Sequence, residues 1–80
     1  MPLQKKQVIK AEKELLIQVG KRVKKYRIAA DMTQNDLAME CNFEKASMSR
    51  IEAGLSNTTI RTLAKIAKAL GIQLADLFQD

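Results

Sequence analysis

The sequence predicts an all-α fold, a compact domain of five helices in a chain of 80 residues. Apolar residues recur at intervals of three and four along most of the chain, which is the spacing of one helix face. β-branched residues are scattered and aromatic residues make up only 4%, so no run of residues favours a strand. Helix-capping residues follow one another at short intervals, which predicts short connections between the helices.

The first predicted helix begins between residues 3 and 13 and ends near residue 30. Its apolar face consists of Leu16, Val19, Val23, Tyr26 and Ala30. We expect this face to be accounted for by the core. Residues 1–17 are predicted to form a basic N-terminal extension, helical or frayed, and residues 18–80 the folded domain.

Local capping chemistry predicts the next boundaries. Asp31 tolerates a left-handed backbone and is expected to end the first helix. Thr33 has the character of an N-cap, and Asp36 three residues later completes a near capping box for a second helix over 34–41. Asn42 also tolerates the left-handed conformation that would end this helix.

The remaining helices follow from the same signals. A third helix is predicted over 45–53, with Gly54 as its stop. Thr58 or Thr59 caps a fourth helix over 60–70, which Gly71 ends. The fourth helix has an apolar face of Ile60, Leu63, Ile66, Ala67 and Leu70. A short last helix carries Leu74, Leu77 and Phe78.

The charge distribution indicates which class of partner the protein binds. The net charge is +5, with seven Lys and two Arg against two Glu in residues 1–30, and five cations against seven acids in residues 31–80. The basic half indicates an anionic partner, of which nucleic acid is the commonest, or else a solvated helix face.

With no His, one cysteine (Cys41), no metal-ligand cluster and no glycine-rich phosphate loop, we expect no enzyme activity, metal, cofactor or small-molecule substrate. Neither a signal peptide nor a membrane span is present, so a cytoplasmic protein is expected.

The predicted second and third helices are too short to be stable alone and must pack against the others. Two short helices joined by a tight turn are typical of a helix-turn-helix, whose second helix enters the major groove of DNA. The outward face of the third helix would carry Lys45, Ala46, Ser49 and Arg50. Lys and Arg can read guanine, Ser can bond several bases, and Ala can contact a thymine methyl.

The chain from about Gly20 to Phe78 resembles the phage repressor and Cro-like (Xre-type) helix-turn-helix family. The resemblance is carried by "GKRVKKYR", "MTQNDLA", "SRIEAG" and "TLAKIAKALGIQLADLF", and it covers about three quarters of the chain. It implies a lambda-repressor-like domain with a central helix-turn-helix. It also implies a transcriptional regulator, most simply a repressor, that binds a palindromic operator in double-stranded DNA as a homodimer.

The resemblance also implies residue roles. Base-reading positions are Lys45, Ala46, Ser49 and Arg50, and phosphate-binding positions are Gln34, Ser47, Ser56, Asn57 and Thr58. Arg27 and Glu52 match a structural salt bridge between the first and third helices. Glu44 departs from the family pattern, since Ser or Thr usually caps the third helix there.

Three alternatives stay open at this stage. Leu74, Leu77 and Phe78 form the dimer interface, alone or joined by the N-terminal helix, or they simply close the monomer core. An antitoxin that masks a toxin protein and represses their shared operon is the rival function. A basic amphipathic helix on an anionic membrane is disfavoured, because no Trp or Phe lies in the first helix.

Overall fold

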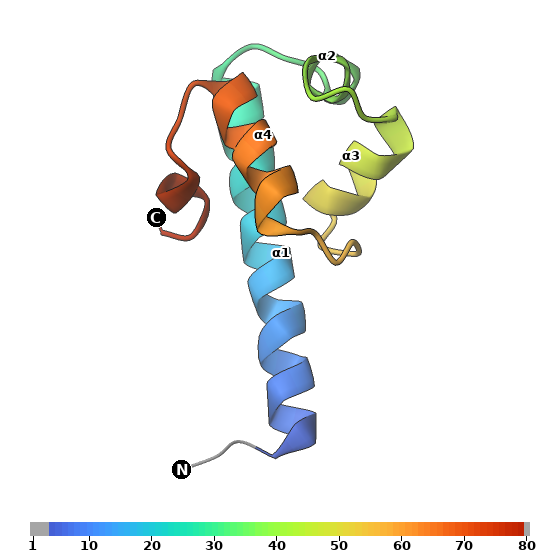
Figure 1. The fold of residues 1–80 in the computed structure, drawn as a ribbon, viewed down its shortest axis with the longest axis vertical. Coiled ribbons are helices and arrows are strands. Elements are labelled where there is room, and N and C mark those ends of the chain that lie inside the picture. The colour runs from blue at the N-terminus through green and yellow to red at the C-terminus, as the bar shows by residue number, and fades with distance from the viewer. Residues whose placement is uncertain (1–3, 80) are drawn as a thin grey trace.

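The computed structural model describes residues 4–79, and within them the chain forms four α-helices and one 3-10 helix, with no strand. The elements are α1 (Lys5–Ala29), α2 (Gln34–Glu40), α3 (Lys45–Glu52), α4 (Ile60–Leu70) and η1 (Leu74–Leu77). In Figure 1, α4 lies along the upper half of α1, with α2 and α3 on one side and η1 on the other. The all-α prediction is confirmed, and the short last helix is a 3-10 helix. Residues 1–3 and 80 of the predicted segments lie outside the described residues.

The predicted helix ends are confirmed where they depend on local backbone chemistry. Asp31 and Asn42 adopt φ values of 58° and 59°, so both turn the chain in the left-handed region. Thr59, rather than Thr58, caps α4 by accepting a hydrogen bond from the Thr62 N–H at 3.1 Å. Gly71 follows α4 with φ 71°, a conformation that glycine adopts without steric cost.

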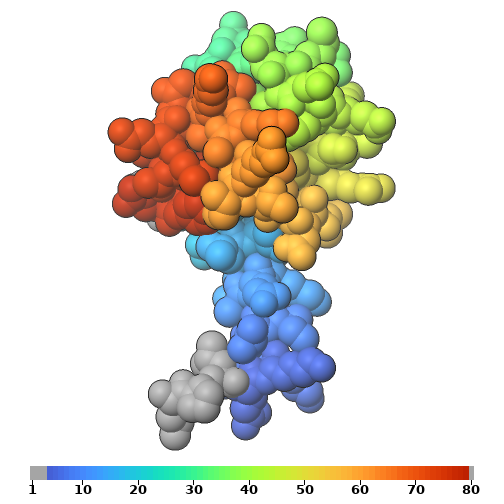
Figure 2. Space-filling model, viewed as in Figure 1, coloured from blue at the N-terminus to red at the C-terminus, as the bar shows by residue number. Residues whose placement is uncertain are grey.

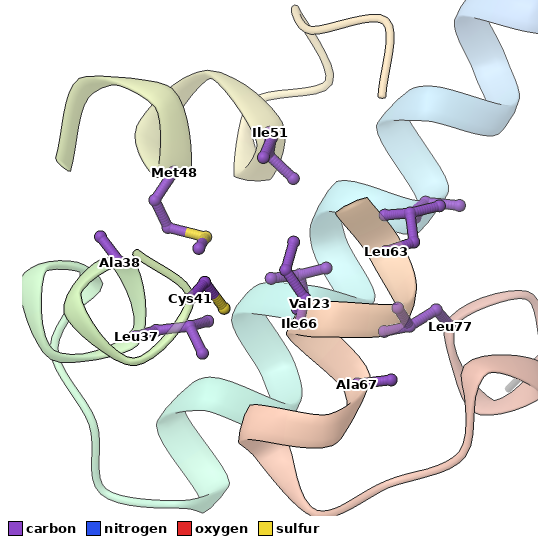
Figure 3. Packing of buried hydrophobic residues seen from close by; sticks show 11 residues of the cluster. Val23, Leu37, Ala38, Cys41, Met48, Ile51, Leu63, Ile66, Ala67 and Leu77 are labelled. Atoms are coloured by element: carbon purple, nitrogen blue, oxygen red, sulfur yellow. The ribbon is translucent and has the colours of Figure 1, made fainter. Parts of the chain in front are cut away.

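A single apolar core lies between the helices of the folded domain (Figure 3). Each of the four α-helices and η1 contributes at least one side chain to it. The buried apolar residues are Val19, Val23, Leu37, Ala38, Cys41, Met48, Ile51, Leu63, Ile66, Ala67 and Leu77. Burial raises the pKa of the Cys41 thiol, so this side chain acts as a small neutral hydrophobe in the core.

The burial of apolar side chains decides one open alternative and corrects one expectation. Leu77 is completely buried in the monomer, so it closes the core and is not available to a dimer interface. Leu74 packs against that core, whereas Phe78 remains 39% exposed. Ile60 was expected on the buried face of α4 but is 62% exposed, because it is the first residue of its helix and lies beyond the end of the core.

The N-terminal half of α1 projects from the domain as a stalk (Figures 1 and 2). The helix runs without a break through the predicted boundary at residues 17 and 18. Its first buried residue is Val19, and Val8, Ile9 and Leu15 upstream are exposed. The expectation that the core accounts for the apolar face of this helix is therefore wrong for the stalk. Among residues 4–79, no helix combines the length and apolar character needed to span a bilayer.

α1 and α3 approach each other closely at Gly20. A Cβ atom added there would lie 2.6 Å from the carbonyl oxygen of Glu52 and closer still to that of Ile51. Both neighbours are backbone atoms of α3, so they cannot move aside without moving the helix. A glycine is therefore required at this point for α3 to sit against α1.

We predict that Gly20→Ala lowers the free energy of unfolding by about 1–3 kcal/mol, because overpacking outweighs the better helix propensity of alanine. Thermal unfolding followed by circular dichroism measures the effect. Gln18→Ala, at an exposed position of the same helix, is the control and should change stability little. A Gly20→Ala protein as stable as its parent would contradict the close contact.

Candidate nucleic-acid interface

α2 and α3 are joined by a short turn that backbone hydrogen bonds hold in place. The Asn42 N–H donates to the Met39 carbonyl at 3.1 Å, and the Phe43 N–H donates to the Ala38 carbonyl at 2.7 Å. These bonds satisfy carbonyl groups that the end of α2 leaves free. Ala38 is completely buried where the two helices meet, which lets their backbones approach. The predicted helix-turn-helix is present.

α3 has one buried and one exposed face. Met48 and Ile51 point into the core from α3 in Figure 3, and Met48 is completely buried. The four predicted base-reading residues share the opposite face and are all exposed, namely Lys45, Ala46, Ser49 and Arg50. The structure therefore brings these four side chains together on one solvent-facing strip with two cations and two small residues.

A buried ion pair fixes α3 to α1. The Arg27 Nε atom donates to Glu52 Oε2 at 2.6 Å and its second terminal nitrogen donates to Oε1 at 3.0 Å, a bidentate arrangement. The Arg27 and Glu52 side chains are only 10% and 3% exposed. The remaining Arg27 nitrogen donates to the Met32 carbonyl at 2.8 Å. The hydrogen bond to Glu52 raises the pKa of Arg27, so this guanidinium stays charged although buried.

Gln34 occupies a different position from the other predicted phosphate-binding residues. Its Nε2 atom donates to Glu52 Oε1 at 3.1 Å, so the first residue of α2 is tied to the ion pair. This contact was not predicted from the sequence, because the two residues are 18 apart in the chain. Gln34 is half-buried, and its amide links α2 to α3.

The other predicted phosphate-binding residues meet in one shallow hollow beside α3. Ser47 lies at the edge of α3, and Ser56, Asn57 and Thr58 come from the loop before α4. Thr59 and Thr62 line the same hollow and were not among the predicted residues. From the sequence, Thr59 was predicted only as a candidate cap of the fourth helix. The result is a rim of hydroxyl and amide groups next to the exposed strip of α3.

The beginnings of α2 and α3 are capped differently. Thr33 and Asp36 form a reciprocal capping box. The Asp36 N–H donates to the Thr33 hydroxyl at 3.0 Å, and the Thr33 N–H donates to the Asp36 carboxylate at 2.8 Å. The bond from the Thr33 N–H is the main cause that lowers the pKa of Asp36. Glu44 is the N-cap of α3, but its side chain makes no capping bond. Its exposed carboxylate stands at the start of the strip.

A helix-turn-helix family model matches residues 23–77, which include every element from the second half of α1 to η1. The chain belongs to the phage repressor and Cro-like helix-turn-helix family. Its members are transcription regulators rather than enzymes. Membership confirms the predicted family, the fold class and a DNA-binding role in transcription regulation.

Several relatives are control proteins. The control protein C.BamHI of Bacillus amyloliquefaciens is 39% identical over 59 residues, which are 72% of this chain and 73% of that protein. The control protein C.MunI of a Mycoplasma species is 34% identical over 68 residues, 84% of this chain and 92% of that protein. The restriction-modification controller protein C.Esp1396I has a crystal structure with a TM-score of 0.73 and 38% identity, covering 80% of this chain and 82% of that one.

The capping box predicts a pH-dependent contribution to stability. Because the pKa of Asp36 is lowered in the folded state, its contribution is present at pH values above the ordinary Asp pKa of about 3.9 and is lost as the pH falls through the lower folded pKa. We predict that parent and Asp36→Asn differ in melting temperature at neutral pH and converge in acid. Thermal unfolding from neutral pH to about pH 2 measures this. Glu40→Gln, in the same helix, is the control, and a pH-independent difference for Asp36→Asn would contradict the assignment.

Glu52→Ala should lower the free energy of unfolding by about 3–5 kcal/mol, because it leaves the Arg27 charge buried without its partner. Denaturant unfolding gives the magnitude, and the amide chemical shifts of α3 report its displacement. The exposed Glu40→Ala variant removes the same charge and should stay within about 0.5 kcal/mol of the parent. Equal stability of Glu52→Ala and its parent would show that the ion pair does not hold α3.

Proposed function

We propose that this protein is a transcriptional controller that binds an inverted-repeat operator in double-stranded DNA as a homodimer. The observation that carries the proposal is the exposed strip of α3, which is polar, narrow and held against the core by its other face. A strip with two small residues between two cations can approach base edges closely. The named control proteins among the relatives support a regulator of restriction-modification type.

Within this proposal, the strip residues have separate tasks. Arg50 and Lys45 donate to guanine O6 and N7, the commonest specific contact in a major groove. Ser49 bonds a base or a phosphate, and Ala46 contacts a thymine methyl group. The Glu44 carboxylate at the start of α3 accepts from a cytosine amino group, because near a phosphate the same charge would be repelled.

The groups beside α3 position the protein on the DNA backbone. The rim of hydroxyl and amide groups donates hydrogen bonds from uncharged side chains to phosphate oxygens. Its members are Ser47, Ser56, Asn57 and Thr58. Gln34 stands at the start of α2, where the helix N-terminus favours an anion. Its amide still donates to Glu52, so in this role Gln34 turns from the ion pair or reaches the phosphate through a water molecule.

A dimer follows from the short reading strip. One α3 helix can contact only a few base pairs, and two copies related by a two-fold axis read two half-sites about one helical turn apart. Phe78 remains an exposed candidate for the interface between the copies. Repression would follow where the bound dimer blocks polymerase. The alternative of a toxin partner receives no support from the relatives.

The decisive experiment is selection of bound sequences from randomised duplex DNA at near-physiological salt. An enriched inverted repeat would support the proposal, and retention of all sequences alike would contradict it. We predict that Arg50→Ala loses about 1–3 kcal/mol of discrimination at one position of each half-site.

Gln34→Ala is the matched comparison, and it should weaken binding to all sequences by a similar factor. Its melting temperature is measured in parallel, because this variant also loses the bond to Glu52. If Arg50→Ala kept both the preferred sequence and the affinity of its parent, α3 would not be the reading helix.

A further inference from the structure

The groups assigned to DNA phosphates under the proposed function carry no positive charge. The rim beside α3 consists of hydroxyl and amide groups, and Gln34 donates from a neutral amide. The acids Asp36 and Glu44 lie at the starts of α2 and α3. Affinity for a duplex depends strongly on the number of phosphates that Lys and Arg neutralise. Cations for the phosphates on either side of α3 would therefore come from a neighbouring element.

One edge of α1 lies directly against α3. α3 passes so close to Gly20 that an added Cβ would meet the carbonyl oxygens of Ile51 and Glu52. Arg27, two turns further along α1, binds the Glu52 carboxylate. Lys24 comes four residues after Gly20 and three before Arg27, so it projects from the same side of the helix. Its side chain is exposed, and no ion pair among residues 4–79 involves it.

Lys24 and Gln34 lie on either side of the same buried contact. The Gln34 amide donates to the Glu52 carboxylate at 3.1 Å, and Arg27, one turn after Lys24, donates to that carboxylate at 2.6 Å. Arg27 is committed to this pair and to the Met32 carbonyl. Lys24 therefore brings an exposed positive charge to the side of the molecule where Gln34 is assigned to a phosphate.

A second lysine occupies the other end of the same edge. Lys13 comes seven residues before Gly20, about two turns of helix, where the stalk meets the folded domain. It lines one hollow with Asn57 and with the residues that directly follow α3. Among these, Gly54 lies so close to α1 that an added Cβ would be 2.7 Å from the Ile17 Cα atom. The loop that carries Asn57 is therefore held beside Lys13.

We propose that this edge of α1 binds backbone phosphates of DNA, with Lys24 beside Gln34 and Lys13 beside Asn57. The proposal rests on the proposed function, because it adds cations to a DNA interface whose other phosphate contacts are neutral. Phosphates are common to all base pairs, so the two lysines supply affinity and fix the position of α3 on the duplex, while α3 reads the sequence. One helix then places a positive charge on each side of the reading helix.

The next lysine of α1 points in another direction. Lys25 follows Lys24 by one residue, a rotation of about 100° around the helix. It lines a hollow formed by side chains of α1 alone, with Gln18, Lys21 and Arg22. Its ammonium lies 5.6 Å from the centre of the Tyr26 ring. Lys25→Gln therefore removes the same charge as Lys24→Gln from the same helix, but outside the proposed edge.

The first test is the salt dependence of binding to a labelled duplex, measured by fluorescence anisotropy over a series of KCl concentrations. Lys24→Gln and Lys13→Gln should each reduce the slope of log K against log [salt] by about 0.9 for every bound subunit. Each should also weaken all duplex sequences by a similar factor. Lys25→Gln is the control and should change the slope by less than about half as much. All three side chains are exposed, so the melting temperatures should match the parent.

Three results of this test would count against the edge. Equal reductions for Lys24→Gln and Lys25→Gln would show that only the overall charge of α1 matters, and would overturn the placement. Unchanged slopes for both Lys24→Gln and Lys13→Gln would show that these side chains stay in solvent, and would overturn the proposal. A reduction for one of the two would overturn the site assigned to the other.

The second test locates the phosphates. Duplexes that carry the selected inverted repeat are prepared with one uncharged methylphosphonate in place of each phosphate in turn. The parent should lose affinity at the contacted phosphates, and a variant should become insensitive at the phosphate that its lost side chain bound. For Lys24→Gln this phosphate should neighbour the one found with Gln34→Ala, and for Lys13→Gln the one found with Asn57→Ala. Parental sensitivity at every phosphate in Lys24→Gln and Lys13→Gln would overturn the proposal.

The outcomes separate this inference from the proposed function. Phosphate contacts do not depend on sequence, so the slopes can also be measured with an unselected duplex. Reduced slopes without an enriched inverted repeat would support the edge of α1 and contradict the sequence-specific function. An enriched repeat with unchanged slopes would overturn the edge alone. A parent that binds no duplex would overturn both.

Discussion

The position of the reading helix depends on the ion pair between Arg27 and Glu52. This pair joins α1 to α3, and further bonds extend it to α2 through Gln34 and to the loop after α1 through the Met32 carbonyl. Four parts of the chain therefore meet at one buried carboxylate–guanidinium contact. Replacing both partners with apolar residues could preserve stability, but it would lose the directional bonds that orient α3.

Directional bonds matter here because the apolar core alone is small. A domain of this size buries only about 60% of the surface of its unfolded chain. α2 and α3 are 7 and 8 residues long, so each depends on packing for its existence. Leu37 and Met48 supply that packing, and Gly20 allows α3 to lie directly on α1. The core sets how deeply α3 sits, and the ion pair sets its rotation, so that the strip with Lys45 and Arg50 faces solvent.

The sequence predicted best what depends on neighbouring residues. The caps at Thr33 and Gly71 and the left-handed turn at Asn42 follow from local backbone chemistry, which context seldom overrides. Contacts that depend on tertiary placement were harder to predict from the sequence. The Gln34–Glu52 bond was missed, because nothing in the residues next to Gln34 or Glu52 indicates it. Hydrophobic periodicity could not tell whether Leu77 faces the core or a partner. The roles of the strip residues came from the family resemblance, and they stay predictions until DNA is bound.

The stalk shows the limit of periodicity most clearly, because an apolar stripe has the same spacing whether the core or another molecule covers it. The structure adds that the stripe and the ion pair belong to one helix. α1 runs unbroken from Lys5 to Ala29, carrying Ile9 at one end and Arg27 at the other. A rigid helix transmits orientation, so the exposed N-terminal half of α1 and the end that holds α3 through Arg27 and Glu52 keep a fixed relation to each other. A contact made by the stalk therefore acts on the same helix that positions the reading helix.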